Sequence, residues 1–202
     1  MFVGGTDTTY TVLEWAMTEL LRHPTILKKL QDEVTEIAKG KQDITESELD
    51  KLPYLKSVIK ETLRLYPPIP LLAPRESRQD TKVNGFDVAV GTMVMTNAWA
   101  IGRDPALWDH PEEFHPERFL NSTVDFQGND GFQLIPFGGG RRGCPGVLFA
   151  MTTIELVLAN LVHKFDWTLP DHEVKSGLDM SECVGLILHR KVPLLAMATP
   201  RF

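Results

Sequence analysis

Apolar residues recur at helical spacing through most of the first 66 residues. They form four separate stripes, and Pro or Gly follows each one. The stripes are Val12 to Leu21 before His23-Pro24, Ile26 to Ala38 before Gly40, a short segment from Thr45 to Pro53, and Tyr54 to Leu63 before Pro67-Pro68. Thr45 and Glu48 have the spacing of a capping box, which favours a helix start there. The first third of the chain is therefore predicted to be helical.

The stretch GGTDTT, residues 4–9, precedes the first stripe and has two interpretations. Thr11 and Glu14 also form a capping-box pattern, so the helix could begin near Thr11. Alternatively, the glycines lie inside a longer helix, where their missing side chains leave a groove for a reaction. Local sequence alone does not decide between these alternatives.

Further elements are predicted along the rest of the chain. Asn84-Gly85 indicates a hairpin, and GTMVMTN, residues 91–97, a further strand. Residues 98–136 are expected to be mostly loop, 147–165 a long helix, and 184–198 a terminal strand pair. The fold class is thus mainly α with small β-sheets, and without repeats or a linker the chain is expected to form part of one domain.

Composition excludes several classes of protein. With 202 residues, 43% of them hydrophobic, the chain can bury a core, and a net charge of −6 argues against a nucleic-acid partner. Two cysteines, Cys144 and Cys183, are too few for a disulfide framework. Cys183 is expected to be a small buried hydrophobe. No histidine pattern favours a metal site, and no uninterrupted apolar run of about 18 residues predicts a membrane span.

The run PFGGGRRGCPG, residues 136–146, stands immediately before the long predicted helix. Cys144 falls at the helix N-terminus, where the helix dipole and nearby amides stabilise a thiolate. A phosphate-binding loop would need Lys followed by Ser or Thr after the last glycine, and Cys144-Pro145 occupies that place. A structural cysteine beside a flexible loop explains neither the arginines nor the spacing.

This run resembles the haem-binding signature F-x-x-G-x-R-x-C-x-G of the cytochromes P450. Every fixed position matches, with Gly139 where many family members have alanine; the matching residues are Phe137, Gly140, Arg142, Cys144 and Gly146. The resemblance implies that Cys144 is the thiolate ligand of the iron of haem b. It also implies that Arg142 pairs with a haem propionate and that the glycines allow close packing on the porphyrin.

Three other segments resemble the same family. Glu61 and Arg64 match its Glu-x-x-Arg pair, and Arg118 matches the arginine of its P-E-R-F element, which implies a buried Glu-Arg-Arg network. The opening residues match (A/G)-G-x-(D/E)-T-(T/S), which lies inside the long helix on the distal side of the haem. By that resemblance Thr8 hydrogen-bonds the iron-bound oxygen and Asp7 helps to relay protons. The resemblance therefore favours the longer helix over a start near Thr11.

Weaker resemblances concern the cofactor and substrate pockets. Arg75 matches a second propionate-binding position. The resemblance also implies a substrate pocket lined by residues from three segments, namely Gly4, Ile69, Leu71, Leu72, Val184 and Gly185.

The resemblance covers residues 1–202 but only the C-terminal part of a single cytochrome P450 domain, from the distal central helix to the terminal strand pair. The predicted helical sequence TDTTYTVLEWAMTELLRHP, for example, looks most like that of plant microsomal members of the largest plant clan. These are haem-thiolate monooxygenases that insert one oxygen atom from O₂ into small lipophilic, specialised metabolites, using electrons from NADPH delivered by a flavoprotein reductase. They sit on the cytosolic face of the endoplasmic reticulum membrane through an N-terminal anchor, which this chain does not contain.

Two interpretations remain for these 202 residues. They are either a fragment of such an enzyme, inactive when isolated, or a truncated, non-catalytic haem-binding or interaction protein that retains the family's motifs.

Overall fold

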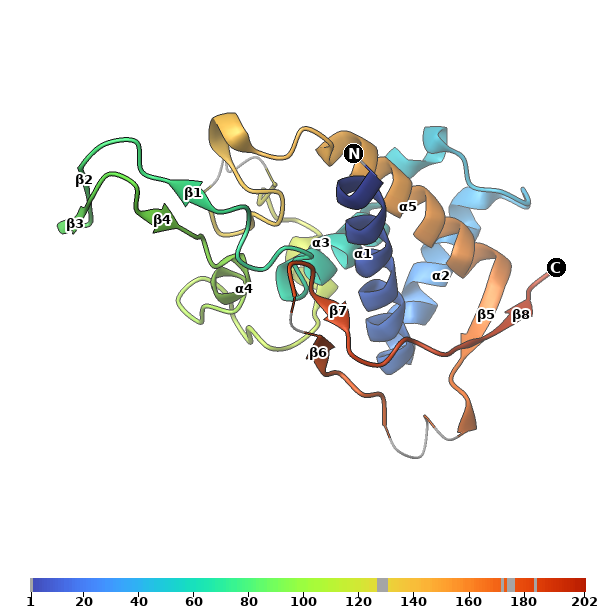
Figure 1. Cartoon of the computed structure of the whole chain (residues 1–202). Coiled ribbons are helices and arrows are strands. Elements are labelled where there is room, and N and C mark those ends of the chain that lie inside the picture. The colour runs from blue at the N-terminus through green and yellow to red at the C-terminus, as the bar shows by residue number, and fades with distance from the viewer. Residues whose placement is uncertain (1, 127–130, 172, 174–176, 184) are drawn as a thin grey trace.

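The computed structural model describes residues 2–126, 131–171, 173, 177–183 and 185–202. Its helical part contains five α-helices and three short 3-10 helices within these residues. They are α1 (Phe2–Arg22), α2 (Pro24–Ala38), η1 (Glu46–Lys51), α3 (Pro53–Leu65), α4 (Ala98–Ile101), η2 (Pro116–Phe119), η3 (Gly140–Arg142) and α5 (Val147–Lys164). The four longest helices pack together as one body, from which a thinner β-containing arm projects (Figure 1).

The main hydrophobic core lies between α1, α2, α3 and α5. Each helix supplies apolar residues from the stripe that its sequence predicts, although Leu148, at the start of α5, is 82% exposed. The completely enclosed core residues include Trp15, Leu20, Leu30, Val34, Leu55, Ile59, Leu158 and Val162. A second, smaller cluster joins Trp108, Phe119 and Leu134 beneath the irregular region. The helices are held by burial of these faces rather than by local propensity.

Helix boundaries agree with the proline, glycine and capping-box signals in the sequence. Pro24 and Pro53 each occupy the first turn of a helix, where the missing N–H costs nothing. η1 begins with the predicted capping box, since the Glu48 carboxylate accepts from the Thr45 backbone N–H at 2.8 Å. After α2, Lys39 and Gly40 both take positive φ, at 48° and 83°, which ends the helix.

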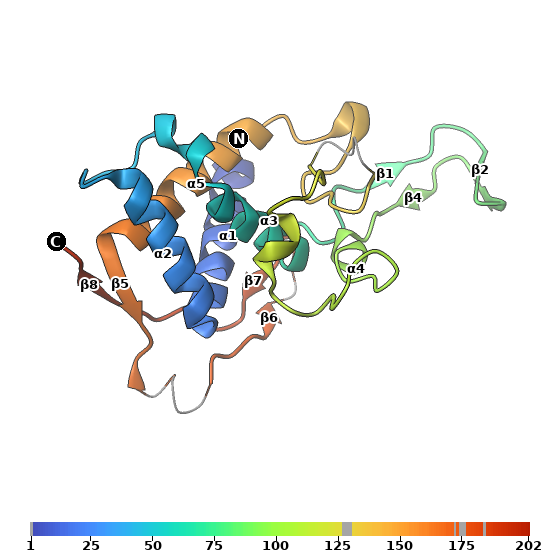
Figure 2. The same cartoon turned by 180° about the vertical axis from the view of Figure 1, so that it is seen from behind.

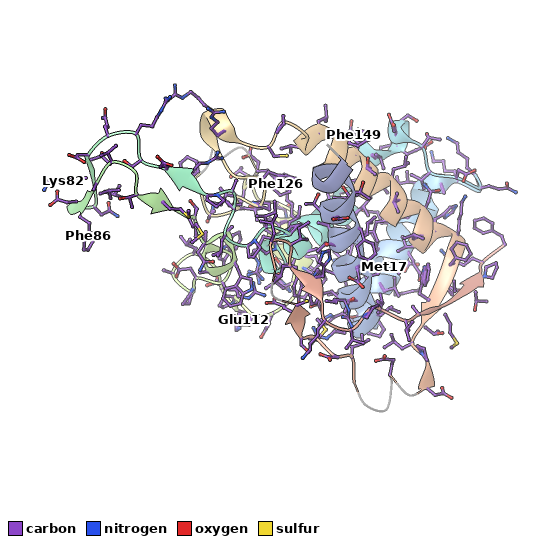
Figure 3. All side chains as sticks on the ribbon, in the orientation of Figure 1. Met17, Lys82, Phe86, Glu112, Phe126 and Phe149 are labelled. Atoms are coloured by element: carbon purple, nitrogen blue, oxygen red, sulfur yellow. The ribbon has the colours of Figure 1, made fainter. Side chains whose placement is uncertain are left out.

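The strands form four antiparallel pairs. β1 (Arg75–Glu76) pairs with β4 (Met93–Val94), β2 (Thr81–Val83) with β3 (Phe86–Val88), β5 (Phe165–Thr168) with β8 (Met197–Pro200), and β6 (Glu182–Cys183) with β7 (His189–Arg190). The β2–β3 hairpin confirms the turn predicted at Asn84-Gly85, where φ is 49° and 86°. Figure 3 shows Lys82 and Phe86 at its far end.

The C-terminal tail differs in detail from the prediction. Its two strands do not pair with each other, because β7 pairs with β6 and β8 pairs with β5, which directly follows α5. The sequence hid this arrangement because the partner strands are only two and four residues long. Strands that short carry little alternating pattern.

One helix of the described residues, α5, is long and apolar enough to cross a membrane by length and composition alone. Its buried face includes Ile154, Leu158 and Val162, and it packs against α1, α2 and α3. Figure 2 shows it within the helical body. One face of α5 therefore belongs to the core, whereas Leu148 and Phe149 at its start are exposed.

Candidate functional site

The loop before α5 is shaped by glycine. Gly138 and Gly140 take φ values of 70° and 64°, which side chains disfavour. The backbone N–H of Cys144 donates to the Phe137 carbonyl at 2.9 Å, which folds the loop back on itself. Cys144 is a free, exposed cysteine two residues before the N-cap of α5, Gly146. The loop therefore presents its thiol outward at a helix N-terminus.

Phe137 fixes the other end of this loop. Its ring meets that of Phe126 edge-to-face, with ring centroids 5.2 Å apart. A Cβ on Gly146 would lie 3.8 Å from the Cys144 sulfur, which is ordinary contact. Gly146 is thus not required by crowding within this chain.

Two arginines lie beside the cysteine loop. The Arg75 guanidinium, on β1, donates through Nη2 to the Arg142 carbonyl oxygen at 3.0 Å. Both side chains are exposed, and neither forms an ion pair with a carboxylate of the described residues. An exposed thiol two residues after Arg142, with Arg75 bonded to the Arg142 backbone, fits a flat, metal-containing group that carries carboxylates, as haem does.

Helix α1 runs unbroken from Phe2 through Gly4 and Gly5. A helix start near Thr11 is therefore wrong, and the Thr11 hydroxyl instead contacts His189 Nδ1 at 2.9 Å. Thr8 donates its hydroxyl proton to the Gly4 carbonyl at 2.8 Å. That bond leaves the Thr8 oxygen free to accept another hydrogen bond.

The opening turn of α1 has room on its surface. A Cβ added at Gly4 or Gly5 would meet no atom within 4 Å, and Asp7 is exposed. The first turns of α1 and α5 lie side by side in both views (Figures 1 and 2), with Phe149 labelled on that turn of α5 (Figure 3). The turn that carries Asp7 and Thr8 thus lies at the same end of the helical body as the cysteine loop.

The predicted Glu-Arg-Arg group forms a closed, buried network. Glu61 is 0% exposed and Arg64 is 1% exposed. Arg64 holds both carboxylate oxygens of Glu61, at 2.7 Å and 2.8 Å, and Arg118 Nε reaches Glu61 Oε1 at 3.0 Å. The three residues that the family resemblance predicted to form a network, Glu61, Arg64 and Arg118, are therefore in direct contact.

The same network ties down the irregular region. Arg64 also donates to the carbonyls of Gly102, Pro111 and Glu113, while Arg118 donates to that of Asp109 at 2.9 Å. Backbone carbonyls of this irregular segment are thus satisfied by guanidinium groups. The two arginines therefore tie residues 102, 109, 111 and 113 to the Glu61 network.

The segments predicted to line the substrate pocket also meet. The Leu188 N–H donates to the Pro68 carbonyl at 2.9 Å, which joins the terminal turn to the segment that holds Ile69, Leu71 and Leu72. A Cβ at Gly138 would lie 3.9 Å from the Leu72 side chain, so that segment also touches the cysteine loop. Gly185 lies in the exposed turn, whereas Val184 falls outside the described residues.

Backbone strain marks the same segment. Leu72 takes a φ of 52°, a left-handed conformation that branched aliphatic side chains rarely adopt. Strained backbone of this kind clusters at functional sites. Its position between Arg75 and the cysteine loop agrees with a place in a binding site.

Comparison with known proteins decides the family. The cytochrome P450 family model matches residues 1–196 of the chain. The chain belongs to the cytochrome P450 family. The chain is 63% identical to cytochrome P450 71A8 of Mentha piperita over 199 residues, covering 98% of the chain and 39% of that protein. It is 52% identical to a 3-beta-hydroxylase of Tanacetum parthenium, over 100% of the chain and 41% of that protein.

Solved structures agree with this assignment. A zebra fish cytochrome P450 determined with abiraterone superposes with a TM-score of 0.87 at 34% identity, over 99% of this chain and 45% of that one. The chain thus spans about two-fifths of the length of its plant relatives and has the fold of the matching part of a cytochrome P450.

Within this P450 fold, two residues matter that the sequence did not single out. A Cβ on Gly102 would lie 2.2 Å from the Arg64 carbonyl oxygen, so no larger residue fits there without movement of the backbone. Trp108 packs against both network arginines: its ring centroid lies 5.3 Å from Cζ of Arg64 and 6.0 Å from Cζ of Arg118. Neither feature has a local sequence signal, because both depend on tertiary approach.

One expectation about the cysteines is wrong. Cys183, expected to be a small buried hydrophobe, is exposed on β6. Strand β6 pairs with β7 on one side only, and its residues lie at the surface of the P450 fold.

Proposed function

We propose that residues 1–202 are the catalytic, C-terminal part of a haem-thiolate monooxygenase. The enzyme would insert one oxygen atom from O₂ into a small lipophilic substrate, a specialised metabolite of a plant. A flavoprotein reductase would pass it electrons from NADPH. Both proteins would work at the cytosolic face of the endoplasmic reticulum membrane. The single observation that carries the proposal is an exposed Cys144 at a helix N-terminus, two residues after an Arg142 whose carbonyl is bonded to Arg75.

Each residue has a defined task in this proposal. When bound, haem supplies the activation of O₂. Cys144, at the N-terminus of α5, would hold the iron through its sulfur. Arg75 and Arg142, which are joined to each other through the Arg142 carbonyl, would hold the propionates by charge-assisted hydrogen bonds.

Protons for the reaction would pass along the opening turn of α1. Thr8 Oγ1 accepts a hydrogen bond from water or substrate because its own proton is engaged by Gly4. Exposed Asp7, one residue earlier, exchanges protons with solvent. The Glu61 network takes no part in this transfer and instead holds the irregular region in place.

The names of similar proteins support the reaction and substrate class. A hydroxylase is among the plant relatives, and the similar zebra fish structures hold abiraterone and progesterone, both lipophilic. Oxygen insertion into a lipophilic compound agrees with both, and the exposed aliphatic Leu71 and Leu186 give the pocket segments a suitable character.

The proposal is tested with Cys144→Ser in a full-length P450 that contains residues 1–202. We expect the variant to lose the thiolate-type absorption band of the reduced carbonyl complex, because a serine hydroxyl does not provide a thiolate. Cys183→Ser is the matched control, since that cysteine is also exposed and free, and it should keep the band. A band that survives in Cys144→Ser would overturn the assignment of the ligand.

A further inference from the structure

The C-terminal tail docks along one face of α1. Thr11, Trp15 and Thr18 recur at intervals of four and three residues, so they lie on one side of the helix. They bond to three consecutive tail residues: Thr11 to His189 at 2.9 Å, Trp15 Nε1 to the Leu188 carbonyl at 3.0 Å, and Thr18 to Arg190 at 3.1 Å. The helix whose first turns contain Asp7 and Thr8 therefore also binds tail residues 188–190.

Leu188 is the point where three segments meet. Its carbonyl accepts from the Trp15 indole, and its N–H donates to the Pro68 carbonyl at 2.9 Å. Both backbone groups of one residue thus connect the tail to α1 and to the pocket segment that follows α3. A shift of Leu188 would disturb both connections together.

Trp15 is itself held in a fixed position. It is 0% exposed, and its ring stacks on Tyr66 with centroids 4.0 Å apart and an interplanar angle of 4°. The Tyr66 hydroxyl donates to the buried Glu19 carboxylate, and Arg190 lies over the indole at 5.5 Å. Tyr66 stands two residues before Pro68, and Pro68 is bonded to Leu188. Trp15 therefore contacts this circuit of residues twice, through its ring at Tyr66 and through its indole N–H at Leu188.

The described residues of the turn that precedes Leu188 lie at the surface. Leu186 is 71% exposed, and a Cβ on Gly185 would meet only the backbone of Ile187, at 3.5 Å or more. The position of this turn is therefore fixed at Leu188.

We propose that Trp15 is a positioning residue for substrate specificity: its indole N–H fixes Leu188 and thereby sets the distance between turn 185–187 and pocket residues 69–72. The inference rests on the proposed function, because it concerns which ligands fit beside a bound haem. It assigns Trp15 no contact with substrate or haem.

The test is Trp15→Phe in a haem-loaded, full-length P450 that contains residues 1–202. Phenylalanine keeps an aromatic ring to stack on Tyr66 but cannot donate to Leu188. Spectral titrations with imidazole and with 4-phenylimidazole give two dissociation constants, and only the larger probe reaches the pocket walls. We expect their ratio to change on the order of fivefold, the effect of one hydrogen bond.

Trp167→Phe is the matched control. Its indole also donates to a backbone carbonyl, that of Leu161 at 2.9 Å, but on β5, outside the circuit through Leu188. The control should leave the ratio within about twofold of the parent. A purely structural role of Trp15 would lower the yield of folded enzyme without changing the ratio in what remains.

Two further measurements keep the proposal falsifiable. If Trp15→Phe does not fold, Thr11→Val removes the neighbouring hydroxyl contact with His189 and should shift the ratio in the same direction, by less. Hydrogen exchange at the Leu188 amide, which requires no haem, should become faster in Trp15→Phe. An unchanged ratio together with unchanged exchange overturns the inference, whereas a parent enzyme without a thiolate-type spectrum overturns only the proposed function.

Discussion

The Glu61 network and the haem-facing end of the molecule satisfy their polar groups in different ways. We use the term haem-facing end for residues 4–9 of α1 and the cysteine loop, residues 136–146. In the network Glu61 and Arg64 are buried, Arg118 keeps 11% of its side chain exposed, and all three charges are bonded within the chain. At the haem-facing end, Cys144, Arg142 and Asp7 are exposed. One set of family residues therefore shapes the protein, while the other set is available to a ligand.

The largest loss of stability is expected from Arg64→Lys. Lysine cannot hold both oxygens of Glu61 and also reach three backbone carbonyls, so buried acceptors are left unpaired. We expect the free energy of unfolding to fall by about 3–5 kcal/mol. Urea denaturation measures this change.

Arg22→Lys is the control for that experiment. Arg22 holds both oxygens of Glu19 at the same i,i+3 spacing, but its side chain is 40% exposed. Its replacement should cost no more than about 1 kcal/mol. Equal losses in the two variants would mean that the burial of the network does not matter.

A smaller loss is expected from Gly102→Ala. The added methyl group would meet the Arg64 carbonyl oxygen at 2.2 Å, and the backbone must move to relieve the clash. We expect a loss of about 1–3 kcal/mol, again from urea denaturation.

At the haem-facing end, Gly5→Ala should increase stability. The new Cβ would meet nothing within 4 Å inside α1, so the helix should gain up to about 1 kcal/mol from the better helix former. A loss of stability in Gly5→Ala would show that the haem-facing end is as constrained as the network.

The smallest effect on stability is expected from Thr8→Ala, with a change within about 0.5 kcal/mol. Function should change instead, because the proposed role of Thr8 depends on the hydroxyl that is lost. In the full-length enzyme we expect several-fold more hydrogen peroxide per NADPH consumed. Thr9→Ala removes an equivalent bond, from Thr9 to the Gly5 carbonyl at 3.0 Å, and should leave this yield unchanged. The same yield in both variants would contradict the role of Thr8.

Much of the fold follows from local sequence. The helices appear where apolar residues repeat every three to four positions, and Pro24, Gly40 and Pro53 mark their limits. The Asn84-Gly85 hairpin follows from two residues that tolerate positive φ. The residues of the Glu61 network were also predictable, but only by resemblance, because an i,i+3 pair is common on helix surfaces.

The remaining features depend on contacts between distant segments. The tail strands pair with β5 and β6, which are too short to show a pattern, and Cys183 is exposed where its residue type favours burial. Gly102 is required only because the Arg64 carbonyl approaches it. The hydrogen bond between Trp15 and Leu188 joins residues 173 positions apart, far beyond any local periodicity.

That last bond also has a consequence for the order of synthesis. A ribosome that adds 5–20 residues per second makes Leu188 roughly 9–35 s after Trp15. During that interval the nascent chain has the indole and the buried face of α1 but not the tail that bonds to them. The nascent protein therefore has to keep this face of α1 from aggregating until strands β7 and β8 have left the ribosome.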